Sequence, residues 1–174
     1  MLQHFLGYEV TCNQDVFNPD TAILMDFRCD QSRGVHFIYY LPFTQRRALV
    51  ESTLFSTSLV SEDFYDKAIK HYLANHLGCT DYTIKRRERG VIPMANLQPR
   101  EPDLTGIGAN GGAIRPSSGY AFSFIQKQID QISNIAKPEK PLQVKKPHSR
   151  FELMMAQIFL DVIRRKPSLA PAIF

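Results

Sequence analysis

Three apolar runs follow one another closely in the first third of the chain, and they constrain the fold more than any other feature. They cover 21–28 (TAILMDFR), 35–43 (VHFIYYLPF) and 47–55 (RALVESTLF), with short turns between them. Strand-length apolar runs with short connections predict an antiparallel β-meander. A further strand-like run covers 3–12. Few residues of the first two runs are strongly polar, so we expect a sheet that is covered on both faces or that lines an apolar cavity.

A helix and a charged strand follow these runs. From Ser61 to about Leu77 the apolar residues fall on one helical stripe, and Ser61 can cap that helix. Residues 82–94 (YTIKRRERGVIPM) have strand character, and their alternation places Arg87 and Glu88 on opposite faces. Strands in the first half and helices after them predict an α+β fold.

A glycine-rich segment precedes a second helix. Five of the nine glycines lie between 106 and 119, and Pro116, two serines and Gly119 lead into an amphipathic run. We expect the helix to begin at about Gly119, with Ser117 or Ser118 as its N-cap. The free N–H groups of such a start can face an anion, so the segment is either a ligand-facing loop or an ordinary turn. It is not a dinucleotide fingerprint, because Pro116 stands where that helix would already be running.

The last part of the chain contains a linker and an apolar helix. Residues 137–147 (KPEKPLQVKKP) are rich in proline and lysine, and Ser149 with Glu152 forms a capping box for a helix to about Lys166. This helix is apolar almost all round, so it must be buried or lie against apolar material. We divide the chain into a β-rich part (1–103), a glycine-rich loop and helix (104–136), a linker (137–148) and a helical part (149–174).

Composition and spacing exclude several classes of function. The net charge is +4, but no nucleic-acid motif accompanies the basic clusters, so we expect no nucleic-acid partner. Three cysteines without CxxC spacing and histidines without ligand spacing predict neither a metal site nor a disulfide framework, and they favour a cytoplasmic location. No window of the sequence is apolar enough to span a membrane. Contact with a membrane surface stays open.

Two carboxylates stand inside apolar strands, where an unpaired charge is costly. Asp26 shares its strand face with Arg28, so it is either half of a structural ion pair or a functional group. Glu51 has no obvious partner, and a carboxyl in an apolar environment has a raised pKa and can donate or accept a proton. From the residues alone, a solvent-facing position fits Glu51 slightly better. Glu88 lies in so charged a strand that we expect it on a solvated face.

Six blocks, taken together and in order, resemble the flavin-dependent lycopene cyclases. They are QHFLGYE (3–9), LMDFR (24–28), FIYYLPF (37–43), RALVEST (47–53), ERGVIPM (88–94) and IGANGGAIRPSSGYAF (107–122). The resemblance covers nearly the whole chain and corresponds to the C-terminal part of that family's proteins. It implies part of a hydroxybenzoate-hydroxylase-like FAD fold. In that fold a sheet lines the polyene tunnel and a glycine-rich loop lies on the flavin side.

The resemblance also implies a reaction. Family members convert the ends of lycopene into β-ionone rings without net redox change: a proton adds to a terminal double bond, the cation cyclises, and a proton is lost. Reduced FAD, kept reduced by NAD(P)H, would stabilise the cation. Lycopene or a related acyclic carotenoid is the implied substrate, and the implied location is peripheral to a membrane. Because the Rossmann fingerprint is missing, we expect a fragment that alone holds no FAD tightly and is inactive.

The matching blocks assign roles to individual residues. Glu51 occupies the position of the glutamate in the family's Phe-Leu-Glu-Glu-Thr-like motif, which makes it the candidate acid–base residue and overturns the solvent-facing interpretation. Asp26, Arg28 and Tyr39 become candidates for contact with the substrate. Ser52 stands where the plant-type motif has a second glutamate, which leaves the ring type open. The candidate flavin contacts are Gly108, Gly111, Gly112, Pro116, Ser117 and Gly119.

Two other kinds of protein remain as alternatives. One is a sister flavoprotein, such as a geranylgeranyl reductase or an aromatic hydroxylase. The other is a non-catalytic module that binds an apolar ligand or a membrane surface. The apolar helix at 151–163 and the basic residues 164–166 motivate the second alternative.

Overall fold

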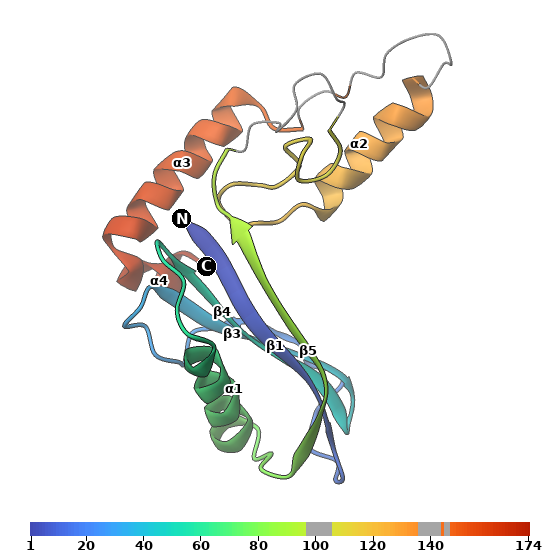
Figure 1. Cartoon of the computed structure of the whole chain (residues 1–174), viewed down its shortest axis with the longest axis vertical. Coiled ribbons are helices and arrows are strands. Elements are labelled where there is room, and N and C mark those ends of the chain that lie inside the picture. Colours follow the sequence, from blue (N-terminus) through green and yellow to red (C-terminus); the bar gives the residue numbers. More distant parts are fainter. Residues whose placement is uncertain (97–105, 136–143, 145–146) are drawn as a thin grey trace. The chain divides into compact units, whose positions relative to one another are not determined.

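The chain forms two compact units in the computed structural model shown in Figure 1. The structure describes residues 1–96, 106–135, 144 and 147–174. The first unit comprises Met1–Ile92 and Ile163–Phe174, and the second comprises Pro93–Val162. The predicted linker at 137–148 lies mostly outside the described residues.

The first unit is built on a five-stranded sheet with the strand order β2-β3-β4-β1-β5. The strands are β1 (Leu2–Cys12), β2 (Ile23–Asp26), β3 (Val35–Thr44), β4 (Arg47–Ser56) and β5 (Tyr82–Pro93). The predicted antiparallel meander is present as β2-β3-β4. β2 is shorter than the apolar run at 21–28, because Met25 has a φ of 60° and the β2–β3 register shifts there. β1 pairs antiparallel with β4 and so lies between β4 and β5.

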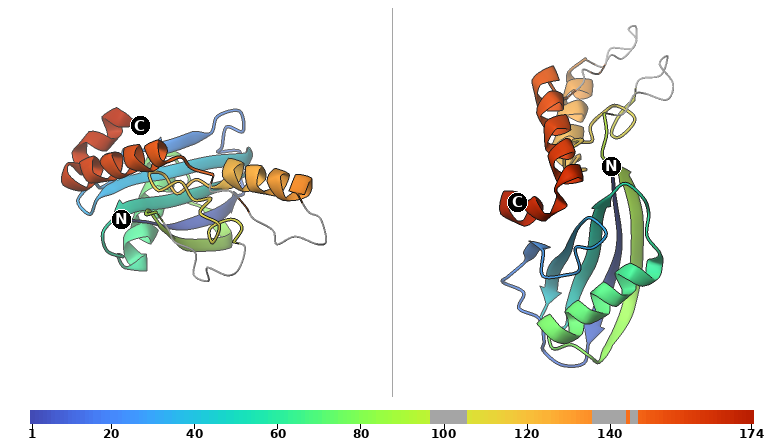
Figure 2. Two further views of the ribbon diagram at one scale, coloured as in Figure 1. Left: turned by 90° about the horizontal axis from the view of Figure 1, so that it is seen from above. Right: turned by 90° about the vertical axis from the view of Figure 1, so that its left-hand side faces the viewer.

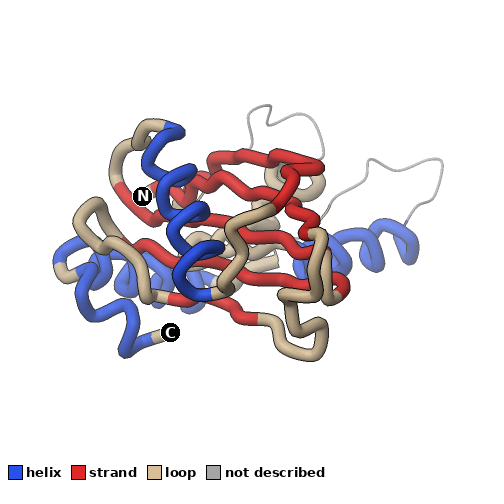
Figure 3. Tube along the Cα trace, turned by 90° about the horizontal axis from the view of Figure 1, so that it is seen from below, coloured by secondary structure: helices blue, strands red, loops and turns tan. Residues whose placement is uncertain are grey.

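Helix α1 (Glu62–His76) packs across one face of this sheet (Figures 2 and 3). Its buried stripe contains Tyr65, Ile69, Tyr72 and Leu73, at the spacing predicted for a one-sided helix. The strands place alternate residues against it, since side chains alternate between the two faces of a sheet. The core between helix and sheet includes Leu6, Tyr8, Val10, Ile38, Tyr40, Val50 and Leu54.

The opposite side of the sheet, called here the distal face, carries the other alternate set of side chains. Its apolar end is buried: the rings of Phe37 and Phe55 lie 5.2 Å apart. Phe174, which follows the short helix α4 (Ala170–Ile173), packs near the rings of Phe55 and Phe27. Both faces of the sheet are therefore covered at this end, as the low polarity of the strands predicts.

The second unit contains the glycine-rich loop and helix α2 (Phe122–Ile135). The predicted start at Gly119, with a serine N-cap, is wrong by three residues. Gly119 has a φ of +69°, which a right-handed helix does not allow, and the N–H of Arg115 donates to the carbonyl of Tyr120 (2.8 Å) to close a turn. The spacing of Phe122, Ile125, Ile129 and Ile132 predicts an inward apolar stripe, but the structure differs: Phe124 and Gln128 are buried, and Phe122 and Ile129 are exposed.

Helix α3 (Arg150–Arg165) begins at the predicted capping box. The N–H of Glu152 donates to Ser149 Oγ (3.2 Å), and the N–H of Ser149 donates to the Glu152 carboxylate (2.7 Å). Burial all round is not observed. One stripe of the helix, Ala156, Leu160 and Ile163, is buried, whereas other sides keep large apolar side chains exposed. The large side chains that stay exposed are Phe151, Met154, Met155, Ile158 and Val162.

Candidate active site on the distal face of the sheet

Glu51 lies near the middle of the distal face. In the strand register it is opposite Gly7 of β1 on one side and Tyr39 of β3 on the other. Thr53, two residues along β4, donates its hydroxyl to Glu51 Oε1 at 2.7 Å. The structure thus brings together two of the predicted site residues, Glu51 and Tyr39.

The burial of Glu51 changes its acid–base behaviour. Burial is the main cause that raises the pKa of this carboxyl to about 7, and the charge of Glu88 raises it further, while the Thr53 hydroxyl lowers it. A group with this pKa is partly protonated at neutral pH, so it can donate a proton and accept one back. Burial also raises the pKa of Tyr39, with the charge of Glu51 as a second cause.

Glu88 approaches the same point from strand β5. A Cβ built on Gly7 would lie 3.1 Å from Glu88 Cγ and 3.4 Å from both Cβ and Cγ of Glu51. The two glutamates therefore reach toward each other over a residue that has no side chain. Glu88 is half-buried and not on the solvated face that the charged strand predicts. The sequence contained one indication that Glu88 lies on the distal face. Alternation in β5 puts Glu88 and Arg87 on opposite faces of the sheet, and Arg87 lies over the ring of Tyr8 on the α1 side.

Asp26 and Arg28 form an ion pair away from Glu51. Arg28 donates from Nη2 to Asp26 Oδ2 at 2.6 Å, and the hydroxyl of Tyr72, on α1, donates to the same oxygen at 2.8 Å. Hydrogen bonds from Arg28 are the largest cause that lowers the pKa of Asp26, to about 2. This carboxylate faces α1, whereas Glu51 faces the distal side. Arg28 also lines a cavity of about 590 Å³ between the β2–β3 connection and α1.

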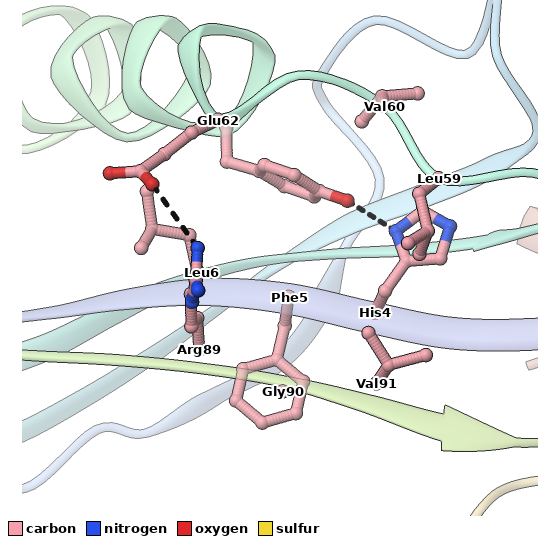
Figure 4. Close-up of a pocket in the computed structure, with 10 residues that line it drawn as sticks. His4, Phe5, Leu6, Leu59, Val60, Glu62, Arg89, Gly90 and Val91 are labelled. Carbon is pink, nitrogen blue, oxygen red and sulfur yellow. Dashed lines mark hydrogen bonds and ion pairs between the residues drawn. The ribbon is translucent and has the colours of Figure 1, made fainter.

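A second buried polar group, His4, lies on the α1 side of β1 beside a cavity of about 330 Å³ (Figure 4). Ser56 Oγ donates to the carbonyl of Ser58 (2.5 Å), so its oxygen is left to accept from His4 Nε2 at 2.8 Å. His4 Nδ1 then accepts from the Tyr65 hydroxyl. Burial lowers the pKa of His4. All donors and acceptors of the ring are matched in its neutral form, so the network holds β1 against α1.

The glycine-rich loop in the second unit has a fixed shape. A Cβ on Gly111 would lie 2.4 Å from the carbonyl oxygen of Gly106, so the backbone crosses itself at a distance that only glycine allows. Gln128 of α2 holds the crossing: it accepts from the N–H of Gly108 and donates to the carbonyl of Gly111, both at 2.9 Å. Gln128 is fully buried and was not identified from the sequence. An amide on the inward stripe of an apolar helix is the pattern that could have indicated it.

The remaining candidate flavin contacts lie where the loop meets α2. Pro116 is buried and Ser117 is half-buried. Ser117 and Arg115 line a cavity of about 340 Å³ with apolar residues of α3. Within the described residues no cluster of three potential metal ligands occurs, and no helix there is both long and apolar enough to cross a membrane.

Comparison with known proteins places this arrangement in a family. The family model described as "Lycopene cyclase protein" matches residues 1–166. The chain belongs to the lycopene cyclase family. A lycopene beta-cyclase from Paracoccus sp. is 29% identical over 147 residues, which cover 78% of this chain and 36% of that protein. A chloroplastic/chromoplastic lycopene beta cyclase from Narcissus pseudonarcissus is 31% identical over 66% of the chain and 26% of its own length.

The relatives do not all have the same printed activity, so family membership alone does not fix the reaction. A neoxanthin synthase from Solanum tuberosum is 30% identical over 66% of this chain and 25% of that protein. The chain spans about a third or less of the length of these curated relatives. A geranylgeranyl bacteriochlorophyll reductase-like protein from Thermoplasma acidophilum has a TM-score of 0.52 and 15% identity, and the match covers 95% of this chain and 40% of that one. This likeness confirms the predicted α+β fold, a fragment of a larger fold.

Proposed function

We propose that this chain is the substrate-binding and flavin-contacting part of a lycopene cyclase, in which Glu51 is the acid–base residue. The observation that carries the proposal is a half-buried carboxyl on the distal face of the sheet, with its pKa raised to about 7. Such a group still carries its proton near neutral pH and can give it up, and an isomerisation needs the proton to be returned. The family membership and the lycopene beta-cyclases among the relatives support the same reaction.

The surroundings of Glu51 suit a hydrocarbon substrate. The strand residues on the same face include Phe5, whose ring lies over Gly90: a Cβ there would be 2.7 Å from Phe5 Cζ. Apolar walls keep water away from a carbocation, and the aromatic face of Tyr39 can stabilise positive charge. Glu51 would then donate a proton to a terminal double bond of an acyclic carotenoid. It would recover a proton from the ring after the carbon–carbon bond has formed.

The loop in the second unit fits a flavin. A Cβ on Gly112 would meet no described atom within 4 Å, so the backbone on that side is open to a planar ligand. Ser117 and Arg115 offer a hydroxyl and a guanidinium to the acceptor atoms of such a ligand. FAD in its reduced state, with NAD(P)H as reductant, would supply electrostatic stabilisation of the cation. We expect this chain alone not to hold FAD tightly and not to turn over.

The test is pigment chromatography of lycopene-accumulating bacterial cells that express the protein carrying this sequence. Glu51→Gln should lower the yield of β-ring pigment at least about 100-fold, the usual loss for a general acid–base residue. Glu9→Gln is the matched control, because Glu9 lies on the same face of the sheet but is paired with Arg47 (2.7 Å). A Glu51→Gln protein that cyclises lycopene normally would remove Glu51 from the reaction. A wild-type protein that leaves lycopene unchanged but reduces an isoprenoid chain would favour the sister flavoprotein class.

A peripheral membrane contact is a separate proposal and rests on α3. Its exposed residues Phe151, Met155 and Ile158 are followed by the basic residues 164–166, a combination typical of helices that lie on anionic membrane surfaces. Co-sedimentation with vesicles that contain anionic lipid should decrease with salt and with a Phe151→Ser, Ile158→Ser double variant. Salt-sensitive binding without any turnover of lycopene would favour the non-catalytic module instead.

A further inference from the structure

Two glutamate side chains lie over Gly7, and the proposed function uses only one of them. Glu51 reaches it from β4 and Glu88 from β5, on either side of β1. A Cβ at position 7 would crowd both side chains, at 3.1 Å from Glu88 and 3.4 Å from Glu51. Two carboxylates in a half-buried site repel each other, and the repulsion is relieved when one proton lies between them.

We propose that Glu51 and Glu88 share one proton above Gly7, and that this pair, not Glu51 alone, is the acid–base group of the site. The inference rests on the proposed function for its chemical meaning. Whether the two carboxyls hold one proton and one negative charge can be tested without measuring turnover.

The charged neighbours decide which carboxyl keeps the proton. Arg86 Nη2 lies 3.9 Å from Glu88 Oε2 and favours a negative charge there. Glu51 is in no ion pair among the described residues, and burial is the largest cause of its raised pKa. The other ionisable groups of the distal strands do not compete for this proton: Glu9 is bound to Arg47, and Tyr39 is a weaker acid than either carboxyl. The proton is thus mainly on Glu51.

A pair of this kind gives the isomerisation a separate acid and base. The proton passes from Glu51 to one carbon of the terminal double bond, which leaves the positive charge on the other, more substituted carbon. The next double bond attacks that cation to form the ring bond. The pair then carries two negative charges, and either carboxylate can take the proton that the ring loses. The pair ends with one proton, as it began, and no electrons are transferred and no water is consumed.

The experiment is a carbon-13 NMR titration of the glutamate carboxyls in this chain between pH 4 and 9. Glu88→Gln should lower the titration midpoint of Glu51 by about one pH unit or more, because the like charge next to it is removed. Glu88→Asp keeps the charge on a shorter side chain and should restore part of the raised midpoint. Glu9→Gln makes the same charge change on the same face and should leave the midpoint where it is.

The outcomes separate the two proposals. Equal midpoints of Glu51 in the wild type, Glu88→Gln and Glu9→Gln would overturn the shared proton and leave the proposed function intact. Normal cyclisation by Glu51→Gln, together with a Glu51 midpoint that falls in Glu88→Gln, would remove Glu51 from the reaction and leave the shared proton intact. If circular dichroism shows that Glu88→Gln does not fold, the Glu88→Asp titration decides. A Glu51 midpoint in Glu88→Asp that differs from the wild type supports the pair, and an unchanged midpoint refutes it.

Discussion

Replacing Glu51 with glutamine should remove a distinctive pH dependence from the stability of the chain. The folded chain raises the pKa of this carboxyl from 4.5 to about 7. Between these values the folded state binds more protons than the unfolded state. The carboxyl therefore contributes stability that is fully present below pH 4.5 and is lost as the pH rises through 7. In Glu51→Gln this contribution is absent at every pH.

The magnitude follows from the width of that window. Proton linkage is worth about 1.4 kcal/mol per pH unit, so the full window from 4.5 to about 7 corresponds to roughly 3 to 4 kcal/mol. The two buried histidines act in the opposite direction. Burial lowers the pKa of His4 and of His36, so they contribute stability that grows as the pH rises toward 6.5. Their contribution is common to both proteins and cancels in the difference between them.

The assay is urea unfolding of the wild type and Glu51→Gln at pH 5, 6, 7 and 8, followed by circular dichroism. The difference in free energy of unfolding, wild type minus variant, should fall by roughly 2 kcal/mol across this range. Glu9→Gln removes an ion-paired carboxylate from the same face and should give a difference that hardly varies with pH. A difference for Glu51→Gln that is equally flat would refute the raised pKa, and with it the argument that this residue is an acid at neutral pH.

Three further substitutions test other parts of the structure. Asp26→Asn removes the charge that Arg28 binds and should lower the free energy of unfolding by about 1–3 kcal/mol in urea titrations at pH 7. Gln128→Leu leaves two backbone groups of the glycine-rich loop without their partner, so hydrogen–deuterium exchange of the loop amides should become faster while that of α1 stays the same. Gly34→Ala should lower the melting temperature, because Gly34 has a φ of +143° and a Cβ would lie 2.3 Å from the carbonyl oxygen of Phe55.

The local periodicity of the sequence predicted most of the helices and strands, but it did not predict which strands pair with each other. The runs at 35–43 and 47–55 became β3 and β4 within one residue at each end, since strand patterns report burial on the faces of a sheet. The pairing of β1 with β4, and the place of β5 beside β1, join segments far apart in the sequence, so no local pattern contains them. The same limit applies to the candidate site. Glu51 was identifiable from its apolar neighbours and its motif, whereas the approach of Glu88 depends on β1 lying between the two strands with a glycine at that point.

The apolar character of α3 was also visible in the sequence, but its burial was not. Apolar residues occupy most sides of the helix, and such a helix usually lies inside a protein. In the structure the stripe through Ala156 and Leu160 is buried, whereas Met154, Met155 and Ile158 are exposed. The composition of a helix indicates which kinds of surface it can contact. It does not indicate which sides of the helix the rest of the chain covers. The expectation that the exposed apolar sides of α3 lie against apolar material stays a prediction. The vesicle experiment tests it.

Ser52→Glu would decide whether the second glutamate of the plant-type motif belongs to the site. Neighbouring residues of β4 point to opposite faces, so position 52 faces α1 when position 51 faces the polyene. Ser52 is fully buried, and its Oγ lies 2.8 Å from Nε2 of His36. His36 Nδ1 donates to the carbonyl of Asp30 (2.7 Å), so Nε2 is the acceptor and the serine hydroxyl is its donor.

A glutamate at position 52 brings a larger side chain into this contact and has no proton to give at pH 8. We expect a loss of roughly 1–3 kcal/mol in the free energy of unfolding at pH 8. The loss should be smaller at pH 6, where a proton taken up by His36 or by the new carboxyl restores the hydrogen bond. Ser52→Ala loses the hydroxyl without adding bulk or charge, so its smaller loss should vary less between the two pH values. The ring type of the pigments should be the same for all three proteins, because the substituted side chain is separated from the distal face by the sheet itself. A change of ring type at unchanged stability would mean that position 52 reaches the substrate, and the assignment of the two faces would then be wrong.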